Sequence, residues 1–126
     1  MRRGRALVLA LALATLSACE TGPRGPRTLA GRVVGSADLA GAVLDVVWSE
    51  VTGFEGQGST QVYWAPVAGE SDRYRVILVA PSGGQLTFGL QVEGHYLHAP
   101  IVTVVEVVAT DNLPRPVGDV RVLLGE

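Results

Sequence analysis

The sequence predicts an all-β domain built as an antiparallel sandwich, and three observations support this prediction. From residue 28 onward, apolar residues rich in Val alternate with polar ones at a period of two, the spacing of a strand with one buried face. Turns containing Gly or Pro separate these runs at intervals of about 8–12 residues. No stretch of the domain carries a sustained apolar stripe at the helical period. Together these features predict an immunoglobulin-like β-sandwich of about seven strands.

Three strands are expected in the first part of the domain. Residues 28–35 are expected to form a first strand at the edge of a sheet. In residues 41–50 every second side chain is apolar and is expected to face the core: Ala42, Leu44, Val46 and Trp48. Asp45 lies between them and is expected to face outward. Residues 60–65 predict a short strand, and the glycine-rich residues 53–59 before it predict a loop.

The next two strands have the clearest patterns. Residues 72–80 place Tyr74, Val76 and Leu78 inward, and their far end is apolar on both faces, as is typical of a covered central strand. Residues 85–94 alternate without interruption, with an inward set of Leu86, Phe88, Leu90 and Val92.

Two strands are expected in the last part. Residues 100–111 are rich in β-branched side chains, which favour strands, and Glu106 is the first charge to interrupt the apolar run. Residues 118–125 alternate again and place Val120, Val122 and Leu124 inward.

Residues 1–18 have the pattern of a targeting segment. Three arginines among the first five residues precede the apolar residues 6–16, which is typical of a secretory signal peptide. A helix of that length spans about 16 Å, roughly half of a bilayer's hydrocarbon core. A permanent transmembrane helix is therefore not expected here.

The apolar run ends in Leu16-Ser17-Ala18-Cys19, which resembles the lipobox of bacterial lipoproteins. The resemblance implies recognition of Leu16, Ser17 and Ala18 by a signal peptidase and attachment of a diacylglyceryl group to the Cys19 thiol. Cleavage before Cys19 would make it the first residue of the mature chain. Two or three acyl chains give a stable anchor where one gives only marginal binding. Membrane lipid is thus the first expected partner.

The same resemblance divides the chain. Residues 1–18 are expected to be the signal peptide, residues 19–27 the lipidated cysteine and a flexible tether, and residues 28–126 a single sandwich domain. Glu20, rather than Asp, follows the cysteine. This is similar to lipoproteins forwarded to the outer membrane, if the host has one, and it implies an exported protein at the cell envelope.

The charge of the mature chain excludes one class of partner. All ten basic residues are Arg, and with three of them in the leader the mature chain has seven against twelve acids, a net charge of about −5. Nucleic-acid binding needs clustered cations to contact phosphates. No nucleic-acid partner is expected.

The sequence shows no converging catalytic set, so we expect no enzyme activity and no cofactor. His95 and His98 are the only histidines, and a zinc site needs three or four ligands. On a strand, positions three apart point to opposite faces, whereas in a loop the two could converge on Zn²⁺ or Cu²⁺. Glu93 is the only carboxylate near them in sequence, and a solvated loop between strands is the expected structure. No metal site is expected.

Tyr63 and Trp64 are the candidate ligand-binding residues. They are adjacent in a predicted strand, so one of the two must point away from the core. An exposed aromatic ring on a sandwich can stack on a sugar or hold a protein partner.

Two sandwich families resemble parts of the domain. "LAGRVVG" and "LAGAVLDV" (residues 29–35 and 39–46) are similar to the opening of transthyretin-like and carboxypeptidase-regulatory domains. The run from "GAVLDVVWSEVTGFEGQG" through "YRVILVAPSGGQLTFGLQV" to "VTVVEVVATD" resembles cohesin-type and carbohydrate-binding-module sandwiches. Both resemblances imply a β-sandwich, and neither supplies binding residues.

These observations lead to one expected function and two alternatives. The first is a lipid-anchored envelope lipoprotein whose non-catalytic sandwich is a structural or protein-interaction module. The second is a carbohydrate-binding lipoprotein that uses Tyr63 or Trp64. The third is an accessory subunit that packs an exposed first or last strand onto a larger envelope complex.

Overall fold

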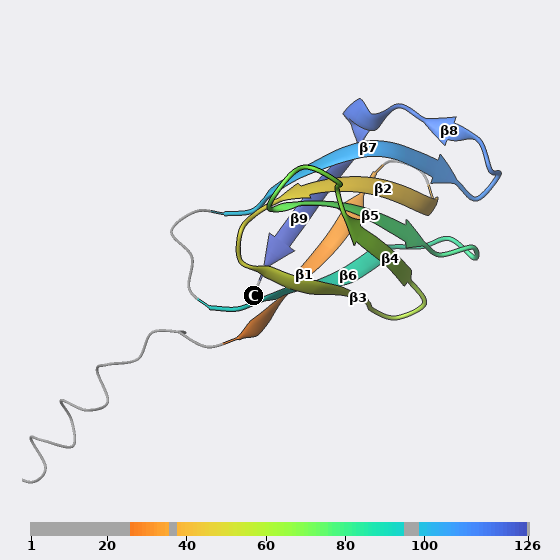
Figure 1. Cartoon of the computed structure of the whole chain (residues 1–126). Helices are drawn as coiled ribbons and strands as arrows, with labels where there is room; N and C mark the ends of the chain where they lie inside the picture. Colours follow the sequence, from red (N-terminus) through yellow and green to blue (C-terminus); the bar gives the residue numbers. More distant parts are fainter. Residues whose placement is uncertain (1–25, 36–37, 95–98, 126) are drawn as a thin grey trace, which may run out of the picture.

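The computed structural model describes residues 26–35, 38–94 and 99–125, which form a sandwich of two antiparallel β-sheets (Figure 1). A short 3-10 turn, η1 (Val117–Asp119), precedes the last strand. The strands are β1 (Arg27–Val34), β2 (Leu39–Val47), β3 (Val51–Gly56), β4 (Gln61–Pro66), β5 (Arg73–Val79), β6 (Leu86–Val92), β7 (Ile101–Ala109), β8 (Pro114–Arg115) and β9 (Arg121–Gly125). The predicted all-β antiparallel sandwich is confirmed.

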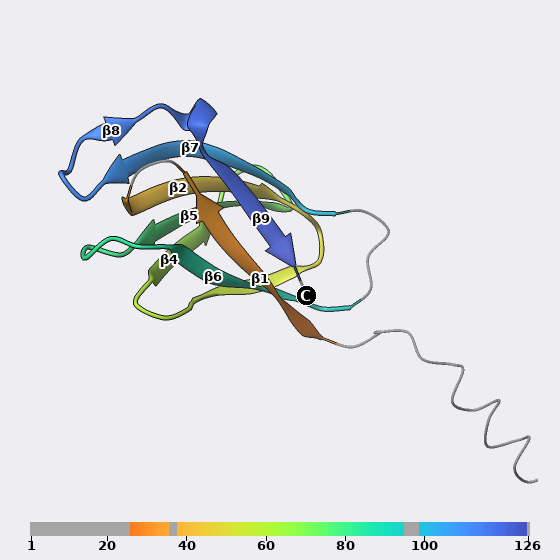
Figure 2. The same ribbon diagram turned by 180° about the vertical axis from the view of Figure 1, so that it is seen from behind.

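The two sheets differ in size. The first, here sheet A, has the strand order β3-β6-β1-β9, and the second, sheet B, has the order β4-β5-β2-β7-β8. Seen from behind, β1 and β9 of sheet A cross in front of β2 and β7 of sheet B (Figure 2). The chain passes from one sheet to the other several times, so each sheet contains strands that are distant in sequence.

The prediction of a loop over residues 53–59 is wrong in its first part. Residues 51–56 form β3, an edge strand of sheet A that pairs with β6. The pairing register shifts between Val51 and Gly53, which places one extra residue in the strand. This bulge breaks the alternation of buried residues, so Val51 and Phe54 do not show the period of two that identifies a strand. Together with the two-residue β8, which was not expected either, β3 brings the described part of the chain to nine strands, where about seven were expected.

The prediction that the first strand lies at an edge is also wrong. β1 lies inside sheet A, between β6 and β9. The last strand, β9, is the one at the edge. A pairing between the two ends of the domain depends on contacts far apart in sequence, and the local alternation of residues 28–35 carries no information about it.

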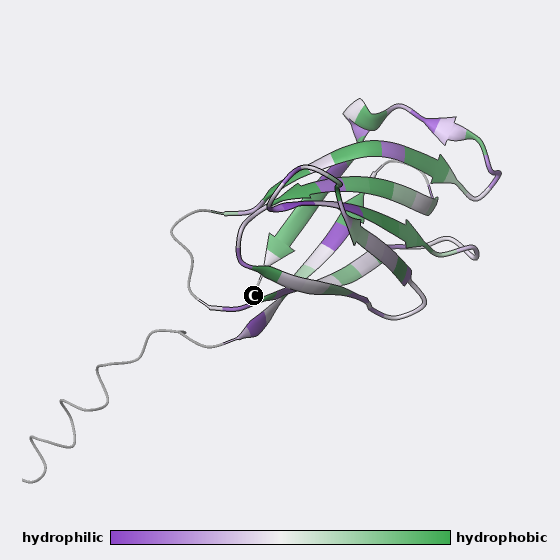
Figure 3. Cartoon of the chain, viewed as in Figure 1, coloured by the Kyte–Doolittle hydropathy of each residue, from purple (hydrophilic) through white to green (hydrophobic). Residues whose placement is uncertain are grey.

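The core lies between the two sheets and is made by the inward side chains of the central strands. The inward sets expected for residues 41–50 and 85–94 are buried, and so are Val76 and Leu78 of β5. Tyr74 and the inward side chains of β9 are only partly buried and pack against the same core. Figure 3 shows the apolar stretches of β2, β5 and β7 in green. The largest fully buried side chains are Phe88, Leu44, Leu78, Leu86, Leu90, Val46, Val76, Val92 and Val107.

Gly31 is a position in sheet A where a buried aromatic ring leaves no room for a side chain. It pairs directly with Phe88 across β1 and β6. A Cβ atom on Gly31 would overlap the ring of Phe88, which is fully buried. The glycine therefore provides the space in which this aromatic ring lies over the sheet.

We predict that Gly31→Ala lowers the free energy of unfolding by about 1–3 kcal/mol, because the new methyl group displaces a buried ring in a close-packed core. Gly41→Ala is the matched control: Gly41 is also a strand glycine, but the nearest atom to its Cβ position is 3.5 Å away. Urea denaturation of both variants measures the difference. Equal stability of the two variants would contradict this account of Gly31.

Candidate functional site

The outer face of sheet B carries a buried carboxylate held by an arginine. Asp45 points away from the core as expected, yet it is only 7% exposed. Arg73 Nε donates to Asp45 Oδ1 at 3.0 Å and to Oδ2 at 3.1 Å. A second arginine, Arg75, places its Nη2 3.8 Å from Oδ1. The long arginine side chains cover the acid, and an outward position therefore becomes a buried one.

The charges of this pair are fixed. Hydrogen bonds from Arg73 hold the pKa of Asp45 below its ordinary value, against the opposing effect of desolvation. The Asp45 carboxylate in turn raises the pKa of Arg73, chiefly by accepting its hydrogen bonds. Glu70 accepts a further hydrogen bond from Arg73 Nη1 at 3.0 Å. Because no proton is exchanged near neutral pH, the cluster ties β2 to β5 and is not suited to acid–base catalysis.

Tyr63 and Trp64 lie on opposite faces of β4, so the structure does not bring the two predicted ligand-binding residues together. Tyr63 is 59% exposed on the outer face of sheet B, opposite Ile77 in the register. Trp64 lies on the inner face, with its ring centroid 5.3 Å from that of Phe54 and 5.9 Å from that of Tyr74. Of these two residues, Tyr63 is the one that presents its ring to solvent on the outer face of the sheet.

Phe54, Trp64 and Tyr74 form an aromatic cluster that closes one side of the sandwich. Their rings meet in tilted and edge-on geometries between β3 of sheet A and β4 and β5 of sheet B. Trp64 remains 40% exposed at the rim of this cluster. Its ring therefore contributes to packing first, and a ligand could reach only its outer part.

Exposed aliphatic side chains on the outer face of sheet B are a feature that the sequence patterns did not indicate. The end of β5 was expected to be covered on both faces, and this is wrong for Ile77, which is 43% exposed. Val43 lies opposite Ile77, and Val47 lies opposite Ile101, which is 65% exposed. A run that is apolar on both faces looks the same in sequence whether a second layer covers it or not.

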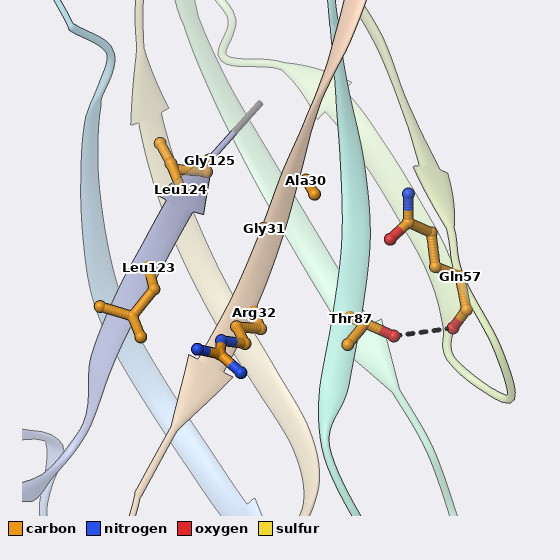
Figure 4. Close-up of a pocket in the computed structure, with 8 residues that line it drawn as sticks. All are labelled: Ala30, Gly31, Arg32, Gln57, Thr87, Leu123, Leu124 and Gly125. Atoms are coloured by element: carbon orange, nitrogen blue, oxygen red, sulfur yellow. Dashed lines mark hydrogen bonds between the residues drawn. The ribbon is translucent and has the colours of Figure 1, made fainter.

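A shallow depression of about 280 Å³ lies on the outer face of sheet A. Figure 4 shows Arg32 on β1 between Leu123 of β9 on one side and Thr87 of β6 on the other. The Thr87 hydroxyl donates to the backbone carbonyl of Gln57 at 3.0 Å. Arg32 is the one charged side chain in the lining, so the depression can hold an anionic group by charge but supplies no second group for proton transfer.

The predicted lipidation site lies outside the described residues. This holds for Cys19 and for the signal-peptidase recognition residues Leu16, Ser17 and Ala18. His95 and His98 also lie outside. Across residues 26–35, 38–94 and 99–125, no three His, Cys, Asp or Glu side chains gather as a metal site would need. The described part of the chain also has no helix long and apolar enough to cross a membrane.

Comparison of the chain with known protein families, with curated proteins and with solved structures gives no match.

We predict that Asp45→Asn lowers the free energy of unfolding at pH 7 by about 1–2 kcal/mol, because it removes the negative charge and one of the two oxygens that accept from the partly exposed Arg73. The folded chain holds the pKa of Asp45 below its unfolded value. Its stabilisation is thus complete above the unfolded pKa and is lost as the pH falls through the folded pKa. Urea denaturation from pH 7 down to pH 2 should show the gap between the variant and the parent chain closing in acid.

Asp111→Asn is the control for this prediction. Asp111 also pairs with an arginine, Arg115 at 2.6 Å, but both side chains are far more exposed than Asp45. The amide retains an oxygen that can accept the hydrogen bond from the Leu113 backbone. A loss at pH 7 as large as that of Asp45→Asn would show that burial of the acid contributes nothing.

Proposed function

We propose that this protein is a lipid-anchored lipoprotein of the bacterial cell envelope whose β-sandwich is a non-catalytic structural or protein-interaction module. The observation that carries the proposal is the sequence Leu16-Ser17-Ala18-Cys19, in which the chain's only cysteine directly follows a short apolar run. Glu20 favours the outer membrane in a host that has one. The anchor is the diacylglyceryl group on Cys19.

The start of the folded domain supports this arrangement. β1 begins at Arg27, so seven residues, 20–26, separate Cys19 from the sandwich. Fully extended, they span at most about 25 Å, which would keep the domain close to the membrane surface. The mature chain carries a net charge of about −5, so electrostatic attraction to anionic lipid does not hold it there. The acyl chains must supply the affinity.

We predict that the full chain incorporates a fatty-acid label in a bacterial host and that Cys19→Ser abolishes it, since the thiol is the acceptor. Ser17→Ala is the matched control, because it changes a neighbouring lipobox residue but keeps a small side chain there. Labelling with an alkyne analogue of palmitate, followed by mass spectrometry of the N-terminal peptide, measures the effect. Label that persists in Cys19→Ser, or a leader still attached to the unchanged chain, would refute the anchor.

A carbohydrate-binding lipoprotein is the second candidate, and the exposure of Tyr63 favours it. A ring that is 59% exposed beside Ile77 on the outer face of sheet B offers a surface on which a sugar can stack. The likeness of the sequence to carbohydrate-binding modules points the same way. Trp64 can contribute only at the rim of the aromatic cluster.

This candidate predicts that the chain is retarded in affinity gels that contain a binding polysaccharide. Tyr63→Ala should remove most of the retardation and Tyr63→Phe should retain it, because the ring supplies the contact. Trp64→Ala should also weaken binding, and its thermal unfolding must be recorded because Trp64 packs on Phe54. Equal retardation of all variants, or none with any glycan, would eliminate the carbohydrate proposal.

An accessory subunit of a larger envelope complex is the third candidate. It is supported by unpaired strand edges in the described part of the chain, since β9 and most of β7 have a strand partner on one side only. Such edges accept an additional strand through main-chain hydrogen bonds.

A further inference from the structure

The core is covered to different extents at the two sides of the sandwich. At the side formed by β3 and β4, the aromatic cluster of Phe54, Trp64 and Tyr74 covers the core. At the opposite side, formed by β7 and β9, the inward side chains are only partly buried although they pack against the core: Val102, Val104, Val122 and Leu124. An apolar seam is therefore open to solvent along this side.

The backbone of β7 is also open on this side. β2 pairs with β7 from Ile101 to Ala109, whereas β8 pairs only with Val107 and Val108. Figure 1 shows β8 and η1 beside the C-terminal half of β7. Within the described ranges, no strand pairs with residues 101–104 on the side away from β2. Main-chain N–H and C=O groups alternate between the two sides of a strand, so this stretch presents unused ones to solvent.

The open edge lacks the features that usually protect an edge strand. Residues 101–105 contain no charge, no proline and no glycine, and every side chain is β-branched. The other edges offer shorter or more interrupted stretches: β9 is short and begins with Arg121, β4 ends at Pro66, and β3 carries Glu55 and a bulge. β7 has a bulge only at Val105, where the register shifts between Val43 and Leu44. The four residues before it form a regular and uncharged stretch of strand, with Pro100 before it and the bulge and Glu106 after it.

We propose that the β7 edge binds the same edge of a second copy of this chain, so that the two B sheets join antiparallel along residues 101–104. The inference gives the proposed interaction module its partner and rests on that proposed function. A two-fold axis through a residue, Val102 or Thr103, places inward side chains opposite inward ones and outward opposite outward ones. Val102 and Val104 of both copies then complete one shared apolar seam.

The absence of charge in residues 101–105 and the alternation of their side chains both allow this edge to pair with a second copy of itself. Self-pairing brings no like charges together over residues 101–105, because none are present. The alternation of the strand matches itself on both faces, which a strand of unrelated pattern would not do. Copies held on one membrane also meet at a raised local concentration, which favours an interface of small area.

The test uses the full chain carrying Cys19→Ser, so that an added cysteine is its only thiol. Thr103 is exposed on β7 and faces outward, and Thr28 is an exposed strand threonine on the outer face of sheet A. With a short bismaleimide, Thr103→Cys should give a covalent dimer as the main product, whereas Thr28→Cys should remain monomeric. Equal yields from the two positions would overturn the proposal, and so would cross-linking of Thr103→Cys to a protein of different mass.

A second measurement needs no cysteine. Sedimentation equilibrium of the unchanged full chain in detergent should give a molecular mass that increases with protein concentration from that of a monomer to that of a dimer. Thr103→Lys should raise the dimer dissociation constant at least about tenfold, since it brings two like charges next to the axis, and Thr28→Lys should not. A chain that stays monomeric, or equal effects of the two lysines, would overturn the proposal. Fatty-acid label on Cys19 in the same unchanged chain reports the anchor separately, so that failure of the dimer and failure of the anchor are distinguishable.

Discussion

Contact between the inner faces of the two sheets holds this domain together, because Cys19 is the only cysteine and no disulfide can close within the sandwich. Leu44, Val76 and Phe88 are fully buried where the sheets meet. A fully buried aliphatic or aromatic side chain contributes about 1.5–3 kcal/mol relative to an exposed one. Because Gly31 has no side chain, the ring of Phe88, the largest of these side chains, can pack directly over it. On the outer face of sheet B, the Asp45–Arg73 ion pair links the neighbouring strands β2 and β5.

The inner contact also explains why the two sides of the sandwich differ. Large rings from three strands fill the space between the sheet edges at β3 and β4 and cover the core there, although Trp64 is 40% exposed at the rim. At β7 and β9 the inward positions hold aliphatic side chains that pack against the core but remain partly exposed. At the β3 and β4 side, the core is thus covered by side chains of the same chain. The other side has unused backbone groups and an apolar seam, which are the properties of a surface that pairs with another strand.

The sequence predicted what depends on local alternation and missed what depends on contacts between distant residues. The inward set of β6 could be predicted because uninterrupted alternation places Leu86, Phe88 and Leu90 on one face. β3 was missed because its bulge removes that alternation, and β1 was assigned to an edge because its pairing with β9 joins the two ends of the domain.

The candidate site shows the same division. Alternation predicts that Asp45 faces outward, but its burial depends on arginine side chains that come from a different strand. Adjacency predicts that Tyr63 and Trp64 point to opposite sides, but only the fold shows that Trp64 packs with Phe54 and Tyr74. The lipobox needs no fold at all, since it is a linear signal, and for that reason the anchor proposal stands on sequence alone.

The most direct measurement of the central claim, a sandwich closed on one side and open on the other, is residue-resolved amide hydrogen exchange of the full chain at two protein concentrations. The account predicts the slowest exchange in β2 and β6 at both concentrations, and protection of Val102 and Val104 that increases with concentration. Fast exchange throughout β6 would contradict the packed core, and protection of Val102 and Val104 equal to that of β2 at high dilution would contradict the open edge.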